Sequence, residues 1–188
     1  MNTKCERYCK RLQSGGVSMS HDTPQIYVVC LAAYNSGRLY GAWIDVLDED
    51  KISEDIEAML ASSPELGAEE WAIHDTKGFG GIEIDENIEV IAMLGALIEE
   101  YGIEIVSAAR DVCSTLGELK KTITDRYLGC FDTREDYAKD IIERTGELRD
   151  VPENLARYFD FVSFGSDLEL GGDICTVRGQ SGLHVFSN

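Results

Sequence analysis

Carboxylates are the most abundant side chains able to do chemistry. The chain of 188 residues has 35 Asp and Glu residues and only 17 Lys and Arg residues. The formal net charge of −18 repels phosphate groups, so it argues against binding DNA, RNA or anionic lipid and favours basic partners. Paired carboxylates can also catalyse acid–base reactions, but acids are so numerous that spacing distinguishes no pair. The composition therefore indicates a charged surface rather than a catalytic site.

The negative charge is concentrated in the middle of the sequence. Residues 45–104 hold 18 acids and two lysines, a net charge of −16, whereas residues 105–150 hold 10 acids and eight bases. A chain adapted to high salt would carry its acids throughout, so this distribution predicts a dedicated acidic face. We predict that the face binds a basic partner through Asp45, Asp48, Glu49, Asp50, Glu54, Asp55, Glu57, Glu65, Glu69, Glu70, Glu83, Asp85, Glu86, Glu89, Glu99, Glu100 and Glu104.

Other chemistry has weak support in the residue pattern. His74 beside Asp75 allows a hydrolase, but no nucleophile lies near them in sequence, so a structural histidine is preferred. Cys5, Cys9 and His21 offer three zinc ligands without a fourth, and buried apolar thiols are the preferred interpretation of most of the six cysteines. The sequence therefore predicts no metal and no cofactor, and its signals for an enzyme are weak.

Two further motifs fail on inspection. The glycine-rich stretch 77–81 lacks the Gly-Lys-Ser/Thr ending of a phosphate loop and runs into three carboxylates. A calcium-binding EF-hand in the register of Asp48 fails because Ile52 and Ser53 stand at ligand and glycine positions.

The acids must be positioned by strands and helices that the hydrophobic pattern predicts. Residues 25–33 and 38–46 are rich in β-formers and flank an Asn-Ser-Gly turn, so they predict a hairpin, with Gly41 marking a bulge or close backbone approach. Helical spacing of Ile52, Ile56 and Met59 then predicts an amphipathic helix coated with acids. Alternation at 69–74 predicts a third strand, after which His74 opens a loop.

The second half of the sequence predicts mainly helices. Asp85 or Asn87 caps a helix that ends before Gly102, and a capping box at Thr133 starts one that ends at Gly146. Further predicted elements are helices at 103–113 and 116–128, a helix opened by Pro152, and a closing hairpin at 174–178 and 183–186. The pattern predicts an α+β protein.

The distribution of polar and apolar residues bears on the N-terminal segment and on the cellular location of the protein. Residues 1–23 lack an apolar period and are expected to form a loose extension. The longest nearly apolar run, Val90 to Ile98, is far shorter than the roughly 20 residues of a membrane helix. Without a secretory signal pattern either, we expect a cytoplasmic protein that binds no membrane.

Four separated strings carry a family resemblance. They are CLAAYNSGRLYGAWIDV at 30–46, EEWAIHDTKGFGG at 69–81, FDTREDYAKDIIERTG at 131–146 and YFDFVSFGSDLELGGDICTV at 158–177. In this order they resemble the ArdA antirestriction proteins of conjugative plasmids and transposons. The resemblance covers the chain from about Pro24 to its C-terminus.

The resemblance implies a protein that imitates B-form DNA and catalyses no reaction. Such a protein occupies the DNA-binding groove of the specificity and methyltransferase subunits of type I restriction–modification enzymes, and thereby protects incoming mobile DNA. It also implies an elongated homodimer with three small domains per chain, which we place at 24–83 (α/β, three-stranded sheet), 84–129 (helical) and 130–188 (α/β). An acidic adaptor or chaperone for basic nucleic-acid-binding proteins remains the alternative, since it requires the same charge without a DNA-like shape.

The string at 131–146 matches the antirestriction motif of this family. This copy carries Lys139 and Arg144 where related chains are more acidic, so two roles stay open, direct contact with the enzyme or packing at a subunit or domain interface. The candidate residues are Phe131, Asp132, Glu135, Asp136, Tyr137, Asp140, Ile141 and Ile142.

Overall fold

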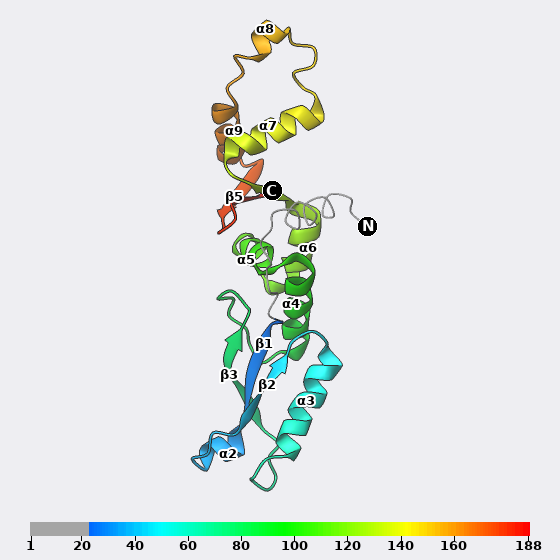
Figure 1. Cartoon of the computed structure of the whole chain (residues 1–188), viewed down its shortest axis with the longest axis vertical. Helices are drawn as coiled ribbons and strands as arrows, with labels where there is room; N and C mark the ends of the chain where they lie inside the picture. The colour runs from blue at the N-terminus through cyan, green and yellow to red at the C-terminus, as the bar shows by residue number, and fades with distance from the viewer. Residues whose placement is uncertain (1–22) are drawn as a thin grey trace. The chain divides into compact units, whose positions relative to one another are not determined.

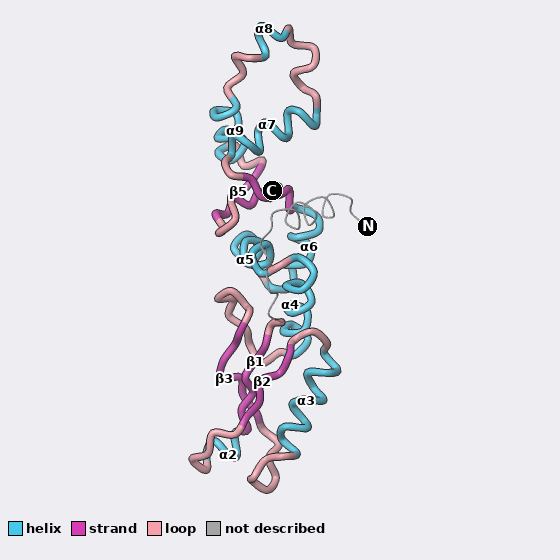
Figure 2. The backbone as a smooth tube through the Cα atoms, in the orientation of Figure 1, coloured by secondary structure: helices cyan, strands magenta, loops and turns pink. Residues whose placement is uncertain are grey.

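Two small antiparallel sheets are interleaved with helices along the chain, which confirms the predicted α+β class (Figures 1 and 2). The computed structural model describes residues 23–188. The chain divides into two compact units at Ser107/Ala108, and each unit contains one three-stranded sheet. The expected extension at 1–23 lies almost entirely outside the described residues, and the expected three-domain boundaries stay a prediction.

The first unit is built on a sheet in the order β2-β1-β3. Its strands are β1 (Gln25–Cys30), β2 (Gly41–Asp45) and β3 (Trp71–Lys77), and both pairings are antiparallel, as the predicted hairpin requires. A β-carbon on Gly41 would overlap the carbonyl oxygen of Val28, which confirms the predicted close backbone approach.

One helix packs on a face of this sheet, and a second helix packs on the first. Helix α3 (Glu49–Ala61) packs against β1 and β2 through its buried Ile52, Ile56 and Met59, and the paired Ile26 and Ile44 are buried beneath it. Helix α4 (Ile88–Tyr101) packs against α3, and α5 (Ile103–Val112) follows directly after Gly102. Both the amphipathic helix and the helix ending before Gly102 are therefore confirmed.

Three strand boundaries in this unit differ from the sequence prediction. The first strand ends at Cys30 rather than residue 33, because residues 31–35 form the short helix α2 (Leu31–Asn35), whose paired alanines favour helix over strand. The second begins at Gly41 rather than residue 38. The third runs on to Lys77, so His74 lies within β3 instead of opening a loop, at a bulge where Asp75 and Ile73 pair with Tyr27 and Val28.

The second unit contains a sheet in the order β4-β6-β5 and, between β4 and β5, three helices, of which the first and third pack on each other. Its strands are β4 (Tyr127–Phe131), β5 (Ile174–Arg178) and β6 (Leu183–Ser187), and its helices are α7 (Arg134–Thr145), α8 (Glu153–Ala156) and α9 (Phe161–Leu170). The core is centred on Tyr137, Ile174 and Val185. The predicted closing hairpin and the capped helix ending at Gly146 are confirmed.

The predicted helix at 116–128 is wrong at its C-terminal end. A 3-10 turn (Leu116–Glu118), helix α6 (Leu119–Lys121) and a π-helical turn (Thr122–Arg126) are followed by strand β4. Pairing with β6 decides this, since Arg126 donates from Nε to the Ser187 carbonyl oxygen at 2.7 Å and Tyr127 pairs with Phe186. This long-range pairing leaves no periodic signal in the local sequence.

Candidate functional site: an acidic surface

Helix α3 displays the densest group of candidate acids. Asp48 caps the helix by accepting a hydrogen bond from the Lys51 backbone N–H at 3.0 Å, which explains its place in the sequence without a calcium ion. The buried stripe of α3 faces the sheet, so Asp50, Glu54 and Glu57 lie on the exposed side. Carboxylates three or four positions apart on a helix have Cβ atoms about 5–6 Å apart, a spacing of the same order as neighbouring phosphates on one DNA strand.

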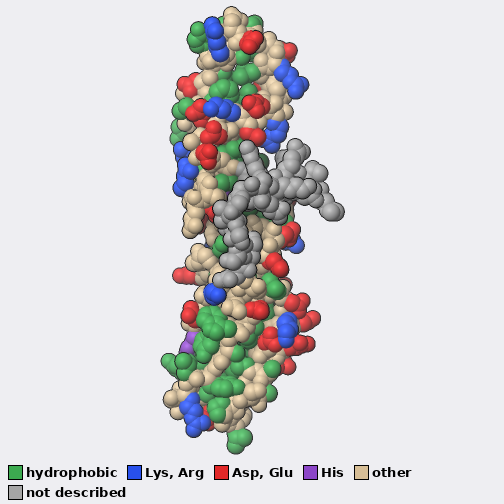
Figure 3. Space-filling view, in the orientation of Figure 1, with side chains coloured by type: hydrophobic (Ala, Val, Ile, Leu, Met, Phe, Trp, Pro, Cys, Tyr) green, Lys and Arg blue, Asp and Glu red, His purple; other side chains and the backbone are tan. Residues whose placement is uncertain are grey.

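Local ion pairs neutralise a minority of these acids. Lys51 binds Asp55 at 2.5 Å, and this hydrogen bond raises the pKa of Lys51. Arg38 binds Glu65 at 3.1 Å. Within residues 23–188, Asp50, Glu54 and Glu57 form no ion pair, so their charges remain available to a basic partner. Figure 3 shows acidic side chains gathered over α3 beside few basic ones.

Helix α4 and the loop before it position a second group. Asn87 caps α4 by accepting from the Val90 N–H at 3.2 Å, and the buried face of the helix directs Glu89, Glu99 and Glu100 to solvent. In the loop, Glu86 accepts from the backbone N–H of Ile73 at 3.3 Å, which ties the loop to the outer edge of β3. These carboxylates are therefore held by folded backbone rather than by a mobile chain.

The structure places all 17 predicted acids in the first unit with solvent access. Asp55, Glu65 and Glu104 are half-buried and the others are exposed. Because most of the acids are exposed and unpaired or only locally bonded, the unit carries a strong negative field.

The residues of the antirestriction motif divide into core and surface. Tyr137 is 2% exposed and Ile142 5%, and Phe131 and Ile141 pack against the same core, with the Phe131 and Tyr137 rings 5.3 Å apart edge to face. Burial raises the pKa of Tyr137. These apolar side chains therefore build the second unit itself.

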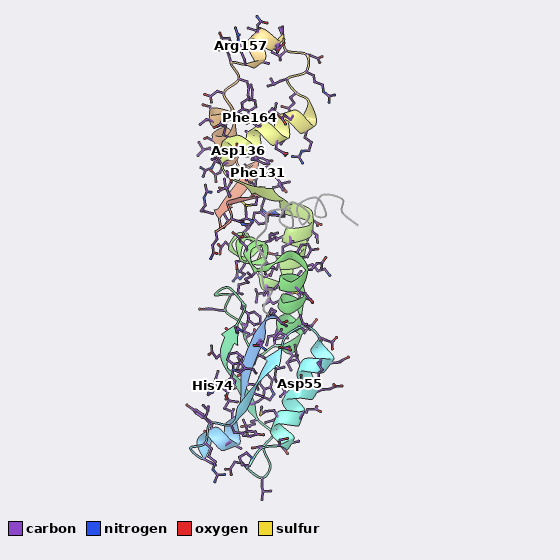
Figure 4. The ribbon with its side chains drawn as sticks, in the orientation of Figure 1. Asp55, His74, Phe131, Asp136, Arg157 and Phe164 are labelled. Atoms are coloured by element: carbon purple, nitrogen blue, oxygen red, sulfur yellow. The ribbon has the colours of Figure 1, made fainter. Side chains whose placement is uncertain are left out.

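Three acids of the motif, Glu135, Asp136 and Asp140, are bonded within α7 and its cap. Glu135 binds Lys139 at 2.6 Å and Asp140 binds Arg144 at 3.4 Å, while Asp136 accepts from the Thr133 hydroxyl at 2.6 Å. Figure 4 shows Phe131 and Asp136 near the start of α7, and Asp132 is exposed just before it. Lys139 and Arg144 thus act as partners for acids of their own helix.

The remaining candidate for catalysis is a surface histidine. His74 stacks edge to face with Tyr34 at 5.0 Å, and Asp75 accepts a hydrogen bond from the Thr76 N–H at 2.8 Å. Figure 4 labels His74 on β3 and Asp55 on α3. Residues 23–188 contain no cluster of three His, Cys, Asp or Glu side chains able to hold a metal, and the set Cys5, Cys9 and His21 lies outside the described residues.

One surface feature escaped the sequence prediction. Tyr27 and Trp43 pair across β1 and β2 with ring centroids 5.3 Å apart, and Trp43 is 46% exposed. Both occupy alternate positions of their strands, so the period-2 pattern around the predicted hairpin could have located the pair.

No helix within residues 23–188 has the length and hydropathy needed to cross a bilayer. The fold and the exposed carboxylates together define an acidic α+β protein whose surface suits basic partners. A family model described as antirestriction protein (ArdA) matches residues 26–181. The chain therefore belongs to the ArdA antirestriction protein family, whose function implies restriction enzymes as its targets. No curated protein matched the chain.

Proposed function

We propose that this protein inhibits type I restriction–modification enzymes by imitating DNA. It occupies the DNA-binding groove of the specificity and methyltransferase subunits, catalyses no reaction, and protects incoming mobile DNA. The observation that carries the proposal is the row Asp50, Glu54 and Glu57 on α3, exposed, unpaired within the described residues and fixed on a folded scaffold.

The negative electric field of the exposed carboxylates suits a groove that binds DNA. A protein that binds DNA has a basic groove suited to about one negative charge per 1.7 Å of duplex axis. Exposed carboxylates held by α3 and α4 present closely spaced negative charges without the ordering cost of a flexible acidic tail. Their mutual repulsion is relieved when lysines and arginines approach, which favours binding further.

Family membership supports two further parts of the proposal. We propose a homodimer, which sedimentation equilibrium measures directly as a mass twice that of the chain. We also propose a cytoplasmic site of action, where restriction enzymes meet incoming DNA.

The experiment adds purified protein to a type I enzyme with unmodified substrate DNA. Inhibited cleavage and methylation at near-stoichiometric protein support the proposal, and unimpeded cleavage with the protein in molar excess overturns it. A competition arm separates a mimic from an acidic adaptor, because duplex DNA displaces a mimic from the enzyme and leaves an adaptor bound elsewhere.

A further inference from the structure

We propose that the face of the first sheet opposite α3 binds an arginine-bearing segment of a protein partner. The binding surface, here called the aromatic patch, consists of Tyr27, Trp43, Asp45 and Asp75. This binding rests on the proposed function, because the arginine-bearing segment belongs to the inhibited enzyme.

Strand register places these residues on one face. Tyr27 pairs with Trp43 on β2 and with Asp75 on β3, and directly opposed residues of antiparallel strands lie on the same face. Asp45 is two residues beyond Trp43 and therefore shares its face, as its hydrogen bond from Gln25 Nε2 at 2.7 Å also indicates. The neighbouring Ile26 and Ile44 point the other way and are buried against α3.

The aromatic pair is open to a ligand. Trp43 and Asp75 are exposed and Tyr27 is half-buried, with the two rings inclined at 47°. Figure 3 shows hydrophobic side chains gathered over the strands of this unit, beside the acidic side chains of α3. Tryptophan and tyrosine bury a large area at low entropic cost, which is why they dominate the binding energy of many protein interfaces.

Carboxylates on either side of the rings define the charge of the occupant. Asp45 and Asp75 each accept one hydrogen bond inside the sheet, and a carboxylate has about four acceptor sites, so both retain capacity for a donor. Lys77 lies in the next row, opposite Gln25, and engages in an interaction of its own. Aromatic faces bordered by carboxylates suit a cation that stacks and donates hydrogen bonds at once.

Arginine fits this chemistry better than the alternatives. Its planar guanidinium stacks on an aromatic ring while its N–H groups reach a carboxylate, whereas the compact ammonium of lysine is strongly hydrated and does not stack in this way. A second copy of the chain would bring Asp45 and Asp75 against like charges, and phosphate groups would meet the same repulsion. The partner is therefore a protein segment that presents arginine.

The test compares Trp43→Ala with wild type in binding to a type I restriction–modification enzyme over a range of salt concentrations. We expect at least a tenfold loss of affinity with an unchanged salt dependence, because the rings contribute contact area and no net charge. Trp43→Phe should recover part of the loss. Leu66→Ala is the matched control, since Leu66 is fully exposed in the same unit and lies off the patch.

The outcomes separate the two proposals. Wild-type protein that fails to bind the enzyme overturns the proposed function, and equal binding by wild type and Trp43→Ala overturns the patch while leaving the proposed function intact.

A second measurement tests the aromatic patch without the enzyme. In fluorescence anisotropy, a labelled peptide of alternating arginine and glycine should bind wild type several-fold tighter than it binds Trp43→Ala. The corresponding lysine peptide should show a smaller difference in affinity between the two proteins. Equal affinity of both proteins for the arginine peptide also counts against the patch, and unchanged circular dichroism shows that each variant is folded.

Discussion

A β-carbon on Gly95 would overlap the backbone carbonyl oxygen of Val46, so helix α4 approaches the end of strand β2 too closely for any other residue. Gly95 lies on the buried face of α4 next to Leu94, and Val46 is fully buried. The same helix carries Glu89, Glu99 and Glu100 on its exposed side. This backbone contact therefore fixes part of the acidic surface against the sheet.

Gly95→Ala should lower the free energy of unfolding by about 1–3 kcal/mol, the usual cost of overpacking a core. The sign of this change distinguishes the close contact from helix propensity. In an unconstrained helix, alanine is more favourable than glycine by about 1 kcal/mol and would therefore stabilise the protein. Urea denaturation measures the effect. Ala96→Ser on the exposed side of α4 is the control and should change stability by less than about 0.5 kcal/mol. A Gly95→Ala protein as stable as wild type would show that α4 does not need this contact.

Charge removal on α3 should act cumulatively. Glu54→Gln alone should change binding to the restriction enzyme little, while Asp50→Asn, Glu54→Gln and Glu57→Gln combined should weaken it and reduce its salt dependence, because fewer counterions are exchanged. Titration at several salt concentrations measures both quantities.

The matched control for charge removal neutralises Glu147, Asp150 and Glu153, three exposed acids of the second unit. This control removes three negative charges, as the α3 triple variant does, but outside residues 45–104. It should weaken binding less than the α3 triple variant. Equal effects of the two triple variants would mean that net charge, rather than the acidic surface of the first unit, determines affinity.

Tyr137→Ala should destabilise the second unit by about 3–5 kcal/mol, because its buried ring packs against Phe131, Ile174 and Val185. Asp140→Asn on the same helix removes only a surface ion pair with Arg144, worth at most about 1 kcal/mol. Thermal unfolding followed by circular dichroism distinguishes them. If Tyr137→Ala kept wild-type stability yet lost inhibition, the ring would have a contact role that its burial argues against.

The second unit should lose stability in acid through Glu169. Burial acts to raise the pKa of Glu169, but hydrogen bonds from Thr176 and Arg134 outweigh it and lower the pKa below the ordinary value of 4.5. A carboxyl with a depressed folded-state pKa stabilises the protein above its unfolded pKa, and this contribution disappears as pH falls through the folded pKa.

Urea unfolding at a series of pH values from about 6 to 3 tests this. Glu169→Gln should be less stable than wild type near neutral pH, and the difference should shrink below about pH 4.5 as the wild-type carboxyl takes up a proton. The exposed Glu153→Gln serves as the control. A difference that stays constant with pH would exclude the charge of Glu169 as its cause.

Local signals in the sequence were sufficient for most elements and their ends. Asn87 and Thr133 cap helices as predicted, and Gly102 and Gly146 end helices with positive φ angles. Helix α2 follows the local helix propensity of its alanines, which the predicted strand at 25–33 overlooked. Strand β4 was missed because it depends on pairing with a strand more than 50 residues away. Local propensity does not report such pairing.

The sequence by itself determined how much charge the protein carries, where along the chain the acids lie, and which family the chain resembles, because composition, local order and matching strings need no coordinates. Tertiary structure decided what each predicted face packs against. Packing of Ile52 and Ile56 against the sheet leaves the acids of α3 outward. In the string at 131–146, by contrast, Tyr137 lies inside a core, and Glu135 and Asp140 pair with neighbouring bases. Register between β1 and β2 likewise brought Tyr27 and Trp43 together, since a side chain's face is set by the strand opposite it.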